Sequence, residues 1–293
     1  MKLAWKFLAT AATLAGLYSS TSNAAVIAVV GDRFELDIIA AEFQTYGDTV
    51  IRYNVGWSLL SDAELDTAFA SDVIWEGDIF SGISAGVQTR MVNFVNSNKG
   101  LMLTAERPCC EPHNDGVEAV GRALTGDNGL LVGDLGFDIF GHAFSNSPTT
   151  ILTSPNDIRG QAAQHNGPGR VQPTGGVNSD ACFTASGATL DVCTAAAWGP
   201  DVLLDEVGRL IIYGDINSQP SLVNNFDGDQ FENMRTFLLT GFTGGGGVCE
   251  TNPNLPGCDN GGGDNGGEVP EPGMLALLGL AGLGLGLIRR RRV

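Results

Sequence analysis

The feature that most constrains the fold is a regular alternation of apolar runs and amphipathic stretches between residues 25 and 106. The first run, AVIAVVGD (25–32), is almost uninterrupted in its apolar character, as expected of a strand that is buried on both faces. The same reasoning predicts further strands over 48–55, 72–78 and 100–106.

Helices are predicted between these strands. Residues 34–47 have apolar side chains at helical spacing and end at a glycine, which is a common helix stop. A second helix is predicted over residues 61–69, because Ser61 and Glu64 at its start have the spacing of a capping box. Residues 84–100 form a third amphipathic stretch, which ends at Gly100.

The pattern returns near residue 208. A buried strand is predicted over 208–215 and a helix over 231–241, with Asp227 or Asp229 in position to cap it. Alternating strands and helices predict an α/β domain with a doubly wound, mostly parallel sheet, which we place at residues 25–243.

The stretch from about 125 to 205 does not follow this alternation. Its part 154–200 is rich in Gly, Pro, Asn and Ser. We therefore expect an insertion of loops and short strands, stapled by a Cys182–Cys193 disulfide and lying along the same edge of the sheet. Loops on a rigid scaffold commonly carry binding function.

Two pieces of the chain resemble the class I glutamine-amidotransferase-like fold, a flavodoxin-like arrangement. One piece is the strand DVIW, then the helix ending VNFVNSNKG and the strand LMLT; the other is GRLIIYGD with a final helix ending FLLTG. The resemblance implies a nucleophilic cysteine on a tight turn directly after the 100–106 strand. Here Glu106 stands nearest that position and no Gly-x-Cys-x-Gly is present, so the family's nucleophile does not carry over.

The segment ERPCCEPHND (106–115) follows a central strand, where ligands bind in open α/β sheets. This segment predicts a small binding site, in which Arg107 would hold an anion or the acidic side chains would hold a divalent cation. The alternative is that Arg107 pairs with a neighbouring acid and a cystine pins the loop. The candidate binding residues are Glu106, Arg107, Glu111, His113 and Asp115.

The chain has six cysteines, an even number that suggests disulfides in an exported protein. Local spacing favours the pairs Cys182–Cys193 and Cys249–Cys258. Cys109 and Cys110 remain, and adjacent cysteines can bridge. If all three bonds form, no thiol is left as a nucleophile.

Two alternative functions depend on other residues. A cysteine-dependent hydrolase would use Cys109 or Cys110, with a base chosen from His113, His142 and His165. A calcium-dependent adhesion module would use the oxygen-rich run 224–233, with Asp227, Asp229 and Glu232 as ligands. Helix capping also explains the two aspartates, and the EF-hand spacing is absent. We therefore predict no cofactor, with calcium as the one candidate.

The charge of the chain restricts its partners. The formal net charge is −17 at pH 7, and the basic residues Lys2, Lys6 and Arg289 to Arg292 all lie outside the segment 25–270. That segment is therefore more acidic than the whole chain. It would repel nucleic acid phosphates and anionic lipid surfaces.

The C-terminus combines three ordered features. Val269, Pro270, Glu271 and Pro272 come first, then 16 uncharged residues from 273 to 288, then Arg289, Arg290, Arg291 and Arg292. A helix that spans a bilayer needs about 20 apolar residues, with a lower limit near 17. The run is short for an anchor, and the arginines provide the cationic stop expected on the cytoplasmic side.

This tail resembles the PEP-CTERM sorting signal of Gram-negative bacteria, over residues 269–293. The resemblance implies that exosortase cuts near Pro-Glu-Pro and that the protein reaches the cell surface or extracellular matrix. It also implies a host that makes extracellular polysaccharide, and membrane contact only through the transmembrane segment before processing. A retained anchor is the alternative.

The N-terminus predicts export as well. Two lysines precede an apolar stretch, and Ser22, Asn23 and Ala24 provide the small residues that signal peptidase recognises, so we expect a signal peptide over 1–24. Residues 244–268 are a glycine-rich spacer by composition. Together these features predict an exported, non-catalytic surface or matrix protein that binds polysaccharide or a matrix partner.

Overall fold

The computed structural model describes residues 24–133, 142–163, 165, 168–175, 181–186, 192–217, 219, 223 and 228–240. The predicted signal peptide, spacer, sorting signal and transmembrane segment lie outside these residues, as do Asp227, Cys249 and Cys258. Within the described part of the chain, none of the helices combines the length and apolar character needed to cross a bilayer.

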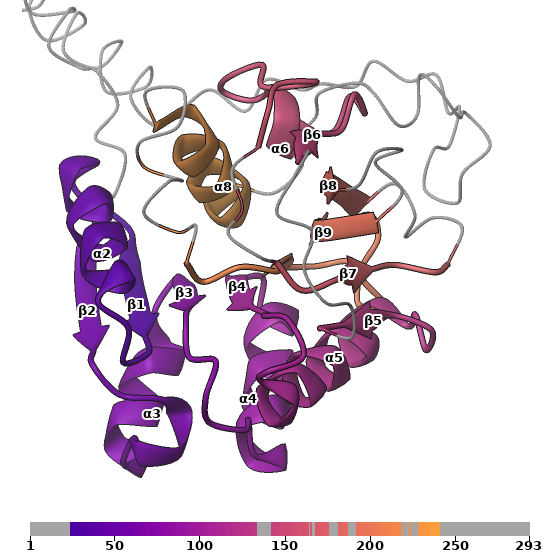
Figure 1. Ribbon diagram of the computed structural model, residues 1–293. Helices are drawn as coiled ribbons and strands as arrows, with labels where there is room; N and C mark the ends of the chain where they lie inside the picture. Colours follow the sequence, from indigo (N-terminus) through magenta and orange to yellow (C-terminus); the bar gives the residue numbers. More distant parts are fainter. Residues whose placement is uncertain are drawn as a thin grey trace, which may run out of the picture. The chain divides into compact units, whose positions relative to one another are not determined.

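The described strands form one large sheet in the order β2-β1-β3-β4-β10-β9-β8-β6, with a separate antiparallel pair β5-β7 (Figure 1). The fold is therefore mixed α/β. The strands are β1 (Val26–Val30), β2 (Thr49–Tyr53), β3 (Val73–Glu76), β4 (Gly100–Thr104), β5 (Leu131–Val132), β6 (Ala143–Phe144), β7 (Val171–Gln172), β8 (Cys182–Ser186), β9 (Val192–Trp198) and β10 (Arg209–Tyr213).

Five neighbouring strands, β2, β1, β3, β4 and β10, run parallel. They are the strands that the apolar runs predict. The connecting helices are α2 (Glu35–Thr45), α3 (Asp62–Ala70) and α4 (Ala85–Asn96), with a short 3-10 helix η1 (Trp57–Leu59) before α3. Ser61 and Glu64 make the predicted capping box, because each side chain binds the backbone N–H of the other residue.

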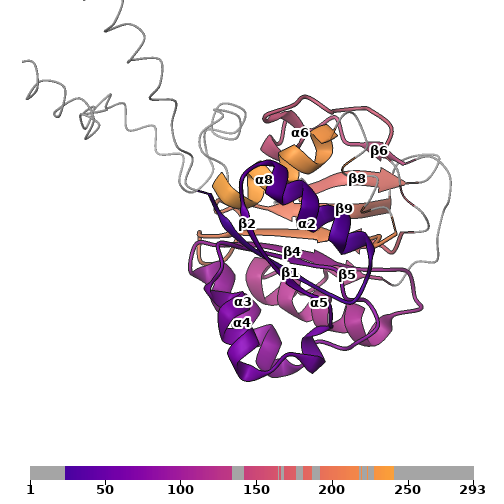
Figure 2. The ribbon, with the colours of Figure 1, turned by 90° about the vertical axis from the view of Figure 1, so that its left-hand side faces the viewer.

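Helices cover both faces of this parallel part (Figure 2). Helices α3, α4 and α5 (Glu111–Thr125) pack on one face, while α2 and α8 (Asp229–Thr240) pack on the other. Successive strand residues point to opposite faces, so Ile27 and Val29 belong to one core and Ala28 and Val30 to the other. This explains why β1 is apolar at every position.

The insertion contributes to the sheet itself. Strands β9, β8 and β6 extend it beyond β10 in antiparallel pairing, and a disulfide joins Cys182 on β8 to Cys193 on β9. The disulfide is as predicted, but the expectation of loops and short strands along one edge is incomplete. Strand β9 is buried along most of its length although its run VCTAAAW is made largely of small residues. The short helix α6 (Thr150–Thr153) also belongs to this region.

Candidate functional site

Polar residues gather where the central parallel strands end. Glu76 is the last residue of β3, Thr104 is the last of β4, and Asp215 lies two residues beyond β10. All three are fully buried, and their strands are neighbours in the sheet. The carboxyl ends of parallel strands are where ligands bind in open α/β sheets, so this edge is the candidate site.

Glu76 forms a buried ion pair with His113 of α5. His113 Nε2 lies 3.5 Å from Glu76 Oε1, and both side chains have no exposed surface. The two ring nitrogens also lie 3.0 Å from the carbonyl oxygens of Ser81 and Thr104. Only a doubly protonated imidazole can donate from both nitrogens, so this geometry calls for the charged form of His113.

Opposing effects set the charge state of this pair. Burial alone would lower the pKa of His113, but the adjacent Glu76 carboxylate raises that pKa to about 9. Burial pushes the pKa of Glu76 upward, and His113 opposes it. The oxygens of Glu76 accept hydrogen bonds from the backbone N–H groups of Asp78 (2.7 Å) and Thr104 (2.9 Å), which favours the carboxylate. We therefore assign the pair as carboxylate and imidazolium.

A second buried network lies beside this pair. The indole N–H of Trp75 donates to Gln219 Oε1 at 3.0 Å, and the Gln219 amide donates to Thr104 Oγ1 at 2.8 Å. Thr104 Oγ1 in turn donates to the backbone oxygen of Glu76 at 2.6 Å. The polar groups of these side chains are therefore used in holding β3, β4 and the segment after β10 together.

Glu106 is buried, with 1% of its surface exposed. The side-chain amide of Asn114 holds its backbone through two hydrogen bonds, 2.9 Å to the carbonyl and 3.1 Å from the N–H. The backbone of the insertion covers it, since a Cβ at Gly169 would collide with the Glu106 carbonyl. Burial, reinforced by the charge of Asp215 and opposed by hydrogen bonds and Arg107, raises the pKa of Glu106 to about 7.

The other predicted residues of the 106–115 loop differ in exposure and in element. Arg107 and Asp115 are exposed. The charge of Arg107 acts on the neighbouring Glu106, as the alternative of a pairing with a nearby acid would have it, but among the described residues no ion pair within 4.0 Å includes Arg107. Glu111 begins α5. Cys109 and Cys110 are bonded to each other, as predicted.

His142 and His165 lie near the same edge. Their ring centroids are 4.9 Å apart, and the ring of His165 stacks on Tyr213 at 5.0 Å. His165 Nδ1 is 3.8 Å from Asp215 Oδ2, which is too long for a hydrogen bond. Burial, together with His142, lowers the pKa of His165 to about 3, so His165 is neutral.

The part of the chain that the structure describes contains no group of three or more His, Cys, Asp or Glu residues arranged to hold a metal ion. The two described calcium candidates lie on α8. Asp229 is its first residue, and Glu232 Oε2 accepts a hydrogen bond from the amide of Asn156 at 3.0 Å. A carboxylate in the first turn of a helix interacts favourably with the helix dipole, which suits Asp229, and the hydrogen bond to Asn156 engages Glu232.

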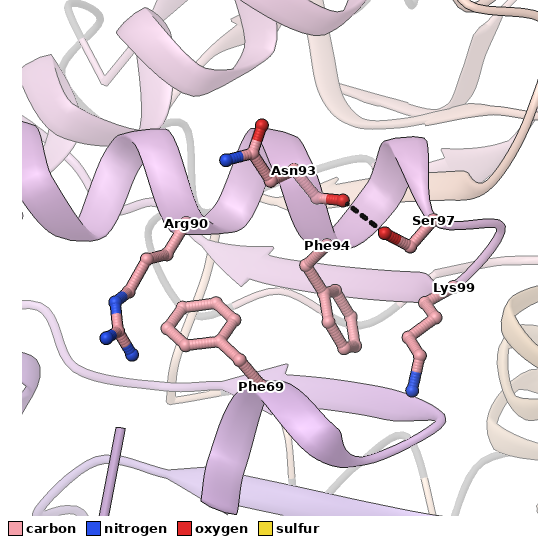
Figure 3. Close-up of a pocket in the computed structure, with 6 residues that line it drawn as sticks. All are labelled: Phe69, Arg90, Asn93, Phe94, Ser97 and Lys99. Carbon is pink, nitrogen blue, oxygen red and sulfur yellow. Dashed lines mark hydrogen bonds between the residues drawn. The ribbon is translucent and has the colours of Figure 1, made fainter. Parts of the chain in front are cut away.

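A surface cavity of about 250 Å³ lies between α3 and α4, beside the starts of β3 and β4 (Figure 3). Its cations are already engaged. Arg90 is 2.8 Å from Asp66, and Lys99 donates to the carbonyl of Ala70 at 3.0 Å. The residues that line it are Phe69, Arg90, Asn93, Phe94, Ser97 and Lys99.

Sequence reasoning missed four residues of the buried network: Glu76, Thr104, Asp215 and Gln219. Three of them had a usable signal, since Glu76 and Thr104 end apolar strands and Asp215 lies two residues beyond one. Gln219 had none, because its contacts with Trp75 and Thr104 join residues more than a hundred positions apart.

Comparison with known proteins gives a family match at the C-terminus and a likeness of fold to solved structures. Residues 268–292 match the model of the PEP-CTERM protein-sorting motif. The solved structure of the mmIFT52 N-terminal domain is similar, with a TM-score of 0.53 and 8% identity, covering 75% of this chain and 99% of that domain. No curated protein matches the chain. At this identity the structural likeness shows the fold alone, whereas the sorting motif supports export and sorting to the cell surface.

Proposed function

We propose that this chain is an exosortase-sorted surface protein whose α/β domain is a non-catalytic binding module. The observation that carries the proposal is the PEP-CTERM match over residues 268–292, since that motif implies processing by exosortase. After cleavage the domain would remain at the cell surface or in the extracellular matrix, where it would bind polysaccharide or a matrix partner.

The geometry of the sheet edge supports a non-catalytic role. At the position where the amidotransferase-like fold would carry its nucleophile, the chain has Glu106, whose backbone Asn114 holds in place. Cys109 and Cys110 are bonded to each other, and both nitrogens of His113 face carbonyl oxygens. A cysteine hydrolase needs a free thiol and an available base, so these contacts weigh against that alternative.

The finer fold assignment is also a proposal. The parallel strands follow the order β2-β1-β3-β4-β10, which corresponds to the flavodoxin-like order 2-1-3-4-5. This order supports the likeness to the class I glutamine-amidotransferase-like fold that the sequence suggests. The antiparallel strands β9, β8 and β6 would then be an extension specific to this chain.

Sorting can be tested by changing Pro270, Glu271 and Pro272 together to Ala in the full chain, expressed in the native host. We expect this variant to stay with the inner membrane, whereas the unchanged protein reaches the surface or the medium. The matched control changes Asn252, Pro253 and Asn254 of the spacer to Ala and should be sorted normally. Normal surface delivery of the P270A/E271A/P272A variant would contradict the proposal.

A further inference from the structure

Exposed apolar side chains collect at the carboxyl edge of the sheet. Phe34 (69% exposed) follows β1, Leu59 (73%) follows β2, and Phe80 (65%) follows β3. Ile38 lies one turn along α2 from Phe34 and is also exposed. The loops that carry Leu59 and Phe80 touch, since a Cβ at Gly56 would collide with the Asp78 carboxylate.

An arginine connects this apolar group to the buried site. The guanidinium of Arg33 lies 5.7 Å from the centre of the Phe80 ring and is held by an ion pair of 2.9 Å with Glu35. Its Nη2 donates to Asn217 Oδ1 at 3.3 Å, and the Asn217 amide lies 3.5 Å from Glu106 Oε2. We call Phe34, Phe80, Arg33, Asn217 and Arg107 the edge strip.

Leaving this much apolar surface in water has a cost. Burying such side chains against a ligand would remove apolar surface from water and favour binding. Single exposed hydrophobic residues are ordinary, but a group of them on adjoining loops marks an interaction surface. The loops of the edge strip also follow the strand ends at which ligands bind in open sheets.

The charges around the edge strip select the kind of ligand. Asp32 is exposed beside the half-buried Arg33, which pairs with Glu35, and Arg107 is exposed as well, so exposed side chains of both signs lie at this edge. A polyanion or a lipid surface would require one dominant sign. Sugar hydroxyls both donate and accept, and sugar rings present flat C–H faces to aromatic rings. A hydroxyl-rich, uncharged ligand therefore matches the edge strip best.

The cavity between α3 and α4 is a weaker candidate for the same ligand. Figure 3 shows Phe69 and Phe94 between Arg90 and Lys99, which resembles the edge strip in composition. However, Phe94 is only 4% exposed. The cavity offers less free ring surface than Phe34 and Phe80 do.

We propose that the edge strip binds an uncharged polysaccharide, with sugar rings stacked on Phe34 and Phe80 and hydroxyls held by Arg33 and Asn217. This inference rests on the proposed binding function and names its site and ligand class. The stacked contacts would supply most of the affinity, because the polar groups exchange water for sugar hydroxyls at little net gain.

The test is native affinity electrophoresis of the surface-recovered protein in gels containing dextran, laminarin or hydroxyethyl cellulose, with alginate as a charged comparison. We expect retardation by at least one uncharged polymer, unchanged in 0.5 M NaCl because no ion pairs are involved. The F34A/F80A variant should bind about tenfold more weakly or worse. The matched control is L204A, which removes a side chain that is 63% exposed away from the edge strip.

Each other outcome overturns the inference. Wild-type affinity in the F34A/F80A variant would mean that the site lies elsewhere, although the binding function would stand. Retardation by alginate alone, lost in salt, would indicate an anion site. Failure to bind any of these polymers, with normal delivery to the surface, would reject the ligand class and leave sorting intact. Loss of a dimer in F34A/F80A, measured by light scattering, would assign the surface to self-association.

Discussion

The parallel and antiparallel parts of the sheet are built by different means. Strands β2, β1, β3, β4 and β10 are short apolar runs separated by helices that cover both faces. Strands β9, β8 and β6 contain several small residues, and the Cys182–Cys193 disulfide links β8 to β9. The first part rests on hydrophobic burial, and the second adds a covalent link.

The two parts also bury histidine in opposite charge states. His113 at the parallel part is a cation beside Glu76, whereas His165 from the insertion is neutral beside His142. The first site provides a counter-charge and two acceptors at hydrogen-bond distance. The second combines burial with a neighbouring histidine, and the carboxylate oxygen of Asp215 is 3.8 Å from the ring nitrogen. The predictions below separate these two kinds of site.

The largest effect is expected from breaking the Glu76–His113 pair. Changing Glu76 to Ala leaves a buried imidazolium without its counter-charge, and such a loss typically costs about 3 to 5 kcal/mol of unfolding free energy. Urea unfolding followed by tryptophan fluorescence measures it. Arg90→Ala, which removes an exposed ion pair with Asp66, is the control and should cost under about 1 kcal/mol. Equal losses of unfolding free energy in the two variants would show that the buried pair contributes no more than an exposed ion pair.

The disulfide of the antiparallel part should come next. The bond between Cys182 and Cys193 spans a sequence separation of 11 residues, and closing a loop of that size stabilises a protein by about 3 kcal/mol. The C182A/C193A variant should lose that stability at the β8–β9 pair first. Hydrogen exchange measures this directly. If exchange in β1 to β4 rose as much as in β8 and β9, the two parts would unfold together.

Glu106 should make the parallel part less stable as pH rises. Its pKa is about 7 in the folded chain against an ordinary value of 4.5, so the folded state holds a proton that the unfolded state has lost. The stability is fully present below pH 4.5 and is lost as pH rises through 7, by up to about 3 kcal/mol. Glu106→Gln should remove this slope. Urea midpoints between pH 4.5 and 8 that fall equally in both proteins would contradict the assignment.

His165 should act in the opposite direction in the insertion. Its pKa is about 3 in the folded chain against an ordinary 6.5, so acidification favours the unfolded state. Stability is present above pH 6.5 and decreases as pH falls toward 3, by about 2 kcal/mol between pH 6.5 and 5. His165→Gln should lack this acid loss while keeping the Glu106 slope. If the His165→Gln variant lost the same stability on acidification, another group would be responsible for that loss.

Local patterns predicted the parallel part well because its elements are local. The runs over 25–106 and the Ser61–Glu64 capping box depend on residues close in sequence, and both are confirmed. The Cys182–Cys193 pair followed from spacing alone.

The rest depends on contacts between distant residues. Strand β9 pairs with β10 through small side chains that carry no strong strand signal, so its place in the sheet was not predicted. In the sequence His113 lies close to the acidic residues of the 106–115 loop. Its partner in the structure is Glu76, which belongs to strand β3 and lies 37 positions earlier. The structure also assigns Asp215 and His165 to one edge, which no local pattern relates.

The most direct test of the proposed sorting and non-catalytic role is the intact mass of the protein from its native host, alkylated with and without prior reduction. We expect a chain that begins at Ala25, ends before Arg289 and takes up no alkyl group without reduction. A chain that retains Arg289 to Arg292 would show that the tail is an anchor. Alkylation of Cys109 or Cys110 without reduction would contradict the non-catalytic role and favour the cysteine hydrolase.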